Sequence, residues 1–213
     1  SRLQRGLRVL AADDAEGYTA LRSFIDPQEA TRLFRGELAL IHAGGELQAG
    51  LATLFRDYDG TDLRRMRAVD IQTYLADCLL PKVDVSTMAH GLEARSPLLD
   101  PNLIQFGLSL PDAFLVDRRG GKRILRDVLR DFYPEGFFDR PKQGFSVPLG
   151  AWFAGPLRQH AQRLGESDAL AATGLLRLDG IRTMLDDHVR GKRDHGHRLY
   201  HLVVLDEWLR WAT

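Results

Sequence analysis

The sequence predicts a mainly α-helical chain. Apolar residues recur at helical spacing in several segments, most clearly over 74–79, 121–132 and 198–211. No stretch alternates apolar and polar residues over more than four positions, as a half-buried strand would. Hydrophobic residues make up 44% and charged residues 27% of the 213, a composition typical of a globular protein with a buried core.

Two helix starts have clear capping chemistry. Asp26 precedes a proline and lies three residues before Glu29, which is the capping-box pattern and predicts a helix over 27–33. Asp100 also precedes a proline, and we interpret it as the cap of a helix over 101–108.

Between these starts, the apolar stripe over 74–79 predicts a helix that Pro81 terminates. Cys78 belongs to this stripe, so we expect it to face the core. A second short helix is expected to follow Asp84, which we interpret as a helix cap or an ion-pair partner. Further helices are predicted over 121–132, 149–164, 180–189 and 198–211, and a shaped loop over 140–148.

Charge and cysteine content exclude several classes of protein. The chain has 29 basic and 29 acidic residues, so it lacks the basic excess typical of a nucleic-acid binder. A single cysteine excludes an intrachain disulfide and a cysteine-rich zinc site, and it favours a reducing, cytoplasmic setting. Neither a stretch of roughly 20 apolar residues nor a signal-peptide pattern is present, so we expect no membrane partner.

Four segments carry a family resemblance. Residues 82–100 read K-V-D-V-S-T-M-A-H-G-L-E-A-R-S-P-L-L-D. Residues 121–126 read G-K-R-I-L-R, residues 140–148 read R-P-K-Q-G-F-S-V-P, and residues 197–202 read H-R-L-Y-H-L. Together they resemble the synthetase domain of glutamine-hydrolysing asparagine synthetases, with few gaps from about residue 71 to residue 211.

The resemblance implies a reaction and a fold. ATP, with Mg²⁺, activates the side-chain carboxylate of aspartate as an acyl-adenylate, and ammonia from glutamine displaces AMP. The implied fold is an α/β adenine-nucleotide alpha-hydrolase-like domain, the PP-loop ATP pyrophosphatase type. This chain would be its helical carboxy-terminal portion, with most sheet strands upstream.

The family's S-G-G-x-D-S loop and its G-x-G-x-D-E segment do not occur in these residues. We therefore expect a piece of a longer enzyme, inactive alone, whose partners are upstream glutaminase and PP-loop regions. Residues 1–62 match the family poorly, and residues 63–213 bear the signature. Apolar surface left bare by missing strands predicts self-association into a homo-oligomer.

Lys142 is the strongest catalytic candidate. Adenylation builds negative charge on the α-phosphate, and a positioned cation stabilises that charge. The matching family lysine has this role, and Gly144 frees the backbone of the same loop for phosphate binding. The alternative is a solvated loop lysine.

Glu93 and Arg95 lie two residues apart in the longest signature. In relatives that form β-lactams, the matching glutamate assists proton removal from the attacking amine, so Glu93 is a candidate base and Arg95 a candidate substrate-binding residue. The alternative is a buried ion pair of Glu93 with Arg95 or Arg123, supporting the wall of the active site.

Lys122 stands at a predicted helix start, where a cation opposes the helix dipole, which favours an anionic neighbour such as a phosphate. A solvated lysine after the glycine pair is the alternative. Asp84 and Asp100 are interpreted as structural support. His197 and His201 share a helix face, but the pattern of a zinc hydrolase is absent, so we predict no metal site.

Three functions remain open at this point. The first is an ATP-dependent amide-forming ligase of the asparagine synthetase type. The second is a related enzyme, such as a β-lactam synthetase or a lasso-peptide cyclase. The third is a helical module that binds partners without catalysis.

Overall fold

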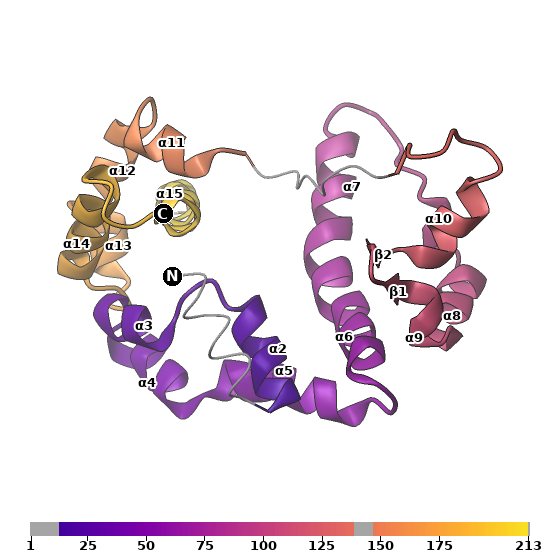
Figure 1. Ribbon diagram of the computed structural model, residues 1–213. Coiled ribbons are helices and arrows are strands. Elements are labelled where there is room, and N and C mark those ends of the chain that lie inside the picture. Colours follow the sequence, from indigo (N-terminus) through magenta and orange to yellow (C-terminus); the bar gives the residue numbers. More distant parts are fainter. Residues whose placement is uncertain (1–12, 139–146, 213) are drawn as a thin grey trace. The chain divides into compact units, whose positions relative to one another are not determined.

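A computed structural model describes residues 13–138 and 147–212, and both stretches are mainly helical, as the sequence predicts (Figure 1). The chain divides into two compact units. Among its described residues, the first unit contains 19–49 and 147–212, and the second contains 13–18 and 50–138. Helices α2 (Asp14–Arg22) and α5 (Glu46–Asp57) run from one unit into the other.

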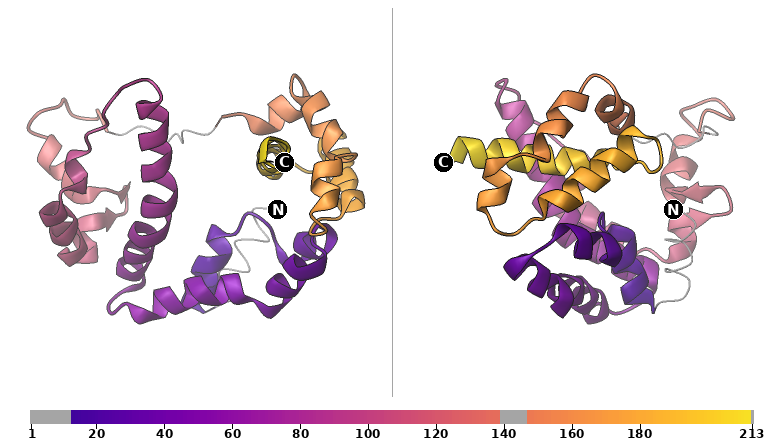
Figure 2. Two further views of the ribbon diagram at one scale, coloured as in Figure 1. Left: turned by 180° about the vertical axis from the view of Figure 1, so that it is seen from behind. Right: turned by 90° about the vertical axis from the view of Figure 1, so that its left-hand side faces the viewer.

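The first unit is built from short helices around a long carboxy-terminal one. Figure 1 shows α15 nearly along its axis, and α11, α12 and α13 pack against it. The right-hand view of Figure 2 shows α15 from the side, and it is the longest helix of this unit. Its helices are α3 (Pro27–Leu33), α4 (Gly36–Gly44), α11 (Leu149–Ala154), α12 (Arg158–Leu164), α13 (Asp168–Ala172), α14 (Leu178–Val189) and α15 (Gly196–Ala212).

A continuous apolar core holds the first unit together. Its fully buried side chains come from five different helices: Phe153, Leu164, Leu170, Ile181 and Leu199. Burial of one such side chain contributes about 1.5–3 kcal/mol.

Two glycines allow the closest backbone approaches in this unit. A Cβ on Gly196 would lie 2.5 Å from the amide nitrogen of Gly150, and a Cβ on Gly180 would lie 2.1 Å from the carbonyl oxygen of Arg32. Since no side chain fits at these distances, both positions require glycine.

Besides its parts of α2 and α5, the second unit contains one long helical rod followed by short elements. The rod comprises α6 (Asp62–Asp70), the π-helical segment η1 (Ile71–Leu79) and α7 (Leu80–Met88). After it come η2 (Pro97–Leu99), α8 (Pro101–Ser109), α9 (Asp112–Leu115), the antiparallel pair β1 (Val116–Asp117) and β2 (Gly120–Gly121), and α10 (Arg123–Leu129).

The core of the second unit is small and lies at one end of the rod. Tyr18 stacks on Phe55 with ring centroids 5.4 Å apart, and its hydroxyl donates to Asp70 at 2.8 Å. From residue 70 to residue 138, no described residue is buried. Many apolar side chains there are therefore bare, including Leu92, Phe106 and Phe132. The bare surface agrees with our expectation, and self-association stays a prediction.

The prediction that Pro81 ends its helix is wrong. The rod continues through Pro81, and the amide of Leu80 donates to the carbonyl of Leu75, five residues back. In an α-helix the proline ring collides with the carbonyl four residues earlier, and the wider π-helical turn moves that carbonyl away. Asp84 consequently lies inside α7 and caps no helix. Cys78 is exposed, because no described element of its unit covers that stripe.

Two other helices are shorter than predicted. Residues 149–164 form α11 and α12 instead of one helix, because Gly155 leaves the helical region and Pro156 lacks an amide proton. Within 121–132, the helix α10 spans only Arg123–Leu129, because Gly121 is paired in β2.

The capping predictions are confirmed. Helix α3 spans Pro27–Leu33, with Asp26 accepting from the amide of Glu29 at 2.9 Å and the Glu29 side chain accepting from Asp26. Asp100 caps α8 by accepting from the amides of Asn102 and Leu103. In the part of the chain that the structure describes, no helix is long and apolar enough to cross a membrane.

Candidate active-site segments

The extended stretch between α7 and η2 carries Glu93 and Arg95. Arg95 Nη2 lies 2.8 Å from Glu93 Oε1, so the two side chains form an ion pair. Their side chains are 82% and 70% exposed, respectively. An exposed pair of this kind contributes at most about 1 kcal/mol to stability.

The predicted ion pair of Glu93 is thus present with Arg95, but it is not buried. Arg123 pairs with Asp127 instead, with Arg123 Nε 3.5 Å from Asp127 Oδ2. Glu93 supports no buried wall in its unit, and its carboxylate is exposed there. Asp84 is exposed on α7, and Asp100 caps α8. Among the described residues, Arg95 pairs with Glu93 and with neither of these aspartates.

Lys122 has a backbone conformation that is unfavourable for a residue with a side chain. Its φ of 61° and ψ of 32° place it in the left-handed region, and among the described residues no other non-glycine residue has a positive φ. It directly precedes α10, next to the carbonyl of Gly121, which accepts from Arg126. Lys122 thus makes the turn between strand β2 and helix α10 in a left-handed conformation.

We expect Lys122→Gly to be more stable than Lys122→Ala by about 1 kcal/mol, because glycine adopts a left-handed conformation without a Cβ clash. Both variants lack the amino group, so the comparison isolates the backbone. Urea unfolding followed by circular dichroism measures the difference. Equal stability of the two variants would contradict the strain.

Lys142 and Gly144 lie outside the described residues. Of the proposed catalytic pair, the structure therefore describes only Glu93. The described residues place Glu93, Arg95 and Lys122 in the second unit.

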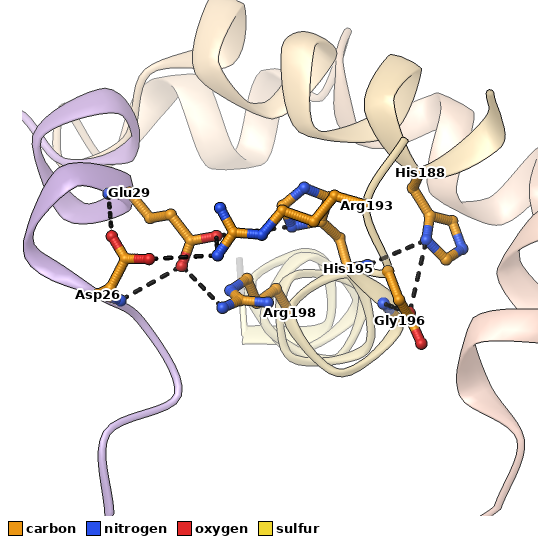
Figure 3. Close-up of polar contacts among 8 residues, drawn as sticks. Asp26, Glu29, His188, Arg193, His195, Gly196 and Arg198 are labelled. Carbon is orange, nitrogen blue, oxygen red and sulfur yellow. Dashed lines mark hydrogen bonds and ion pairs between the residues drawn. The ribbon is translucent and has the colours of Figure 1, made fainter. Parts of the chain in front are cut away.

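The first unit contains a buried ionisable group that the sequence did not reveal, here called the Glu29 cluster: Asp26, Glu29, Arg193, His195 and Arg198 (Figure 3). The Glu29 side chain is only 6% exposed. Its Oε2 lies 2.7 Å from Arg198 Nη2, and its Oε1 lies 2.9 Å from Arg193 Nη2. Figure 3 shows Arg193, from the segment before α15, and Arg198, from α15, directed toward Glu29 of α3. No local sequence pattern indicates this contact.

His195 of this cluster is hydrogen-bonded to a second buried histidine, His188. His188 Nε2 donates to the carbonyl of Gly150 at 3.0 Å, and His188 Nδ1 accepts from the amide of His195 at 3.0 Å, which fixes one neutral tautomer. The buried Nδ1 of His195 has no hydrogen-bond partner among the described residues and lies 3.8 Å from Glu29 Oε1. Burial, together with the charges of Arg198 and Arg193, lowers the pKa of His195 to about 4.

This pKa predicts acid sensitivity. The unfolded histidine takes up a proton near pH 6.5, whereas the folded one does so only near pH 4, so stability falls as the pH drops through this window. The upper limit of the loss is about 3 kcal/mol. Urea unfolding at several pH values should show a smaller loss for His195→Gln than for the exposed control His197→Gln. Equal losses would contradict the assignment. The groups facing His195 are Glu29, Asp187, His188, Arg193 and Arg198.

The remaining histidines of this region make aromatic contacts. His201 meets Phe24 edge to face at 5.4 Å, and His197 lies 6.3 Å from the same ring. Within 13–138 and 147–212, no group of three or more histidine, cysteine or acidic side chains is placed to hold a metal ion.

Comparison with known proteins gives the family. The model of the family described as asparagine synthase matches residues 6–210. The chain belongs to the asparagine synthase family. Its signature over 82–100 lies in this match, so the resemblance seen in the sequence is confirmed.

Individual relatives agree with the family. A Mycobacterium tuberculosis protein provisionally named asparagine synthetase (glutamine-hydrolyzing) is 34% identical over 160 residues, covering 74% of this chain and 24% of that protein. Asparagine synthetase (glutamine-hydrolyzing) 1 of Bacillus subtilis is 27% identical over 148 residues, covering 70% and 23%. The human asparagine synthetase is 38% identical over 89 residues, covering 38% and 16%. The chain thus spans about a quarter of the first two relatives' length. No solved structure matches it.

Proposed function

We propose that the complete protein is a glutamine-dependent asparagine synthetase. An oxygen of the aspartate side-chain carboxylate attacks the α-phosphorus of ATP, and pyrophosphate leaves. Ammonia from glutamine then attacks the activated carbonyl carbon, the bond to AMP breaks, and a base takes the extra proton. The observation that carries this proposal is the family match over 6–210, supported by relatives named for this activity.

The helical units described above would form the carboxy-terminal part of a PP-loop ATP pyrophosphatase domain in that enzyme. In this proposal, the glutaminase region and the pyrophosphate loop of the complete enzyme lie outside these residues. ATP requires Mg²⁺ in this chemistry. The described residues contain no group suited to hold a metal, so we assign Mg²⁺ no ligand among them.

Within this proposal, the roles of the candidate residues follow from charge and position. Lys142 stabilises the charge that develops on the α-phosphate, and Gly144 gives its loop the freedom to approach the phosphate. Arg95 and Lys122 are the cations assigned to substrate or phosphate oxygens. Asp100 supports α8 as its cap, whereas Asp84 is exposed in the middle of α7 and keeps no supporting role among the described residues.

Glu93 is assigned as the proton acceptor for the attacking ammonia. We expect Glu93→Gln to lower kcat about a hundredfold, because glutamine is isosteric but cannot accept the proton. Steady-state kinetics of the complete enzyme measure this effect. The matched control is Glu135→Gln, another exposed glutamate of the second unit. A kcat of Glu93→Gln no lower than that of Glu135→Gln would remove this role.

The test of the proposed function is an assay of the complete enzyme for AMP release. We expect release to require both aspartate and a nitrogen source, either glutamine or ammonia, and to match asparagine formation one for one. A ring-closing relative would release AMP without any nitrogen source. A helical binding module would release none.

A further inference from the structure

The first unit contains a cavity of about 580 Å³ whose polar lining is mostly arginine. This volume lies in the range of sites for small molecules. Three arginines and one aspartate line it, so the formal charge of the lining is +2. The lining residues are Arg35, Ala171, Leu176, Arg177, Leu178, Asp179 and Arg182, so we call it the Arg35 cavity.

The backbone beneath the Arg35 cavity is fixed by pairing of two segments far apart in the sequence. The amide of Arg35 donates to the carbonyl of Leu175 at 2.9 Å, and the amide of Arg177 donates to the carbonyl of Leu33 at 2.8 Å. These bonds flank the isolated antiparallel bridge between Phe34 and Leu176. The backbone positions of Arg35 and Arg177 are therefore fixed by these hydrogen bonds.

Two of the guanidinium groups are held by their inner nitrogen. Arg182 Nε donates to the carbonyl of Gly165 at 2.7 Å, and Arg177 Nε donates to the carbonyl of Phe34 at 3.3 Å. Anchoring at Nε leaves the terminal nitrogens available and reduces the side-chain entropy that a ligand would have to overcome.

The three arginines of the Arg35 cavity form no ion pair within the described residues. Within the described part of the chain, none of the three arginines has a carboxylate at ion-pair distance, whereas Arg193, Arg198 and Arg210 of the same unit all do. Three unpaired cations around one hollow create a positive potential that a multiply charged anion would neutralise. The planar fork of arginine fits phosphate oxygens in particular.

We propose that the Arg35 cavity binds a compact, multiply charged phosphate compound. Leu178 and Asp179 form the first turn of α14, whose dipole adds to the positive potential. The carboxylate of Asp179 opposes an anion and limits affinity. This proposal concerns the first unit alone and does not rest on the proposed function.

Isothermal titration of the full chain with inorganic pyrophosphate at low salt tests the proposal. We expect saturable binding whose affinity falls as salt rises, because exposed charges are screened. The double variant Arg35→Gln/Arg182→Gln should bind at least about tenfold more weakly, since two charge-assisted contacts are lost. The control Arg190→Gln should bind like the wild type, because Arg190 is already paired with Asp186 in this unit.

Asp179→Asn provides a test that misfolding cannot imitate. Removing the opposing negative charge should tighten pyrophosphate binding about threefold. Absence of saturable binding would overturn the proposal. So would equal affinity of the double variant and Arg190→Gln.

Discussion

Replacing Lys142 by alanine in the complete enzyme is expected to remove asparagine synthesis while ATP still binds. Negative charge grows on the α-phosphate oxygens as aspartate attacks, so a cation placed there stabilises the transition state more than the bound substrates. Loss of one such group typically lowers kcat about 10²–10³-fold. The affinity for ATP should change little, because this stabilisation is realised mainly in the transition state.

The measurement is steady-state AMP release together with ATP binding by titration. Lys192→Ala is the matched control, because Lys192 is another of the four lysines and pairs at the surface with Asp187 at 3.0 Å. Lys142→Arg keeps the charge but alters its geometry, so it should retain intermediate activity. Near-normal turnover of Lys142→Ala would show that this lysine is only a solvated loop residue.

Local chemistry explains which parts of the fold were predictable. The capping box around Asp26 and the cap at Asp100 depend on residues three or fewer positions apart, and both occur as predicted. The apolar spacing near the carboxy terminus likewise gave the region of α15, because one face of that helix packs into the core of its own unit.

The structure around Pro81, Cys78 and Glu93 depends on residues that a local sequence pattern does not include. Pro81 is compatible with a helix only because η1 widens the turn before it. Cys78 has core-like spacing but no described element covers it. The family signature predicted Glu93 as a site residue, yet its exposure depends on the course of the chain around 89–96.

The Glu29 cluster shows the same limit for electrostatics. Sequence identified Glu29 as the second half of a capping box, a role worth about 1 kcal/mol. Its ion pairs with Arg193 and Arg198 join residues more than a hundred positions away. Nothing in the local pattern indicates that one carboxylate serves both purposes.

This double role predicts a large loss of stability for Glu29→Gln. Removing one partner of a buried ion pair typically costs about 3–5 kcal/mol, because the remaining charges are left without compensation. Here Arg198 keeps its guanidinium in a site where its side chain is only 13% exposed. The cap of α3 also changes, since the carboxylate that accepts from Asp26 is lost.

Urea unfolding followed by tryptophan fluorescence measures this loss, because Trp152, Trp208 and Trp211 all belong to the first unit. Glu37→Gln in the neighbouring helix α4 is the control, since Glu37 is exposed and its loss should cost less than about 0.5 kcal/mol.

A double-mutant cycle with Arg198→Met separates the ion pair from the cap. If the buried pair dominates, Arg198→Met should cost much less in the Glu29→Gln background than in the wild type, because its unpaired charge is then removed. Additive losses would instead assign the effect of Glu29 to capping alone. A loss for Glu29→Gln no larger than that for Glu37→Gln would mean that the cluster contributes nothing to stability.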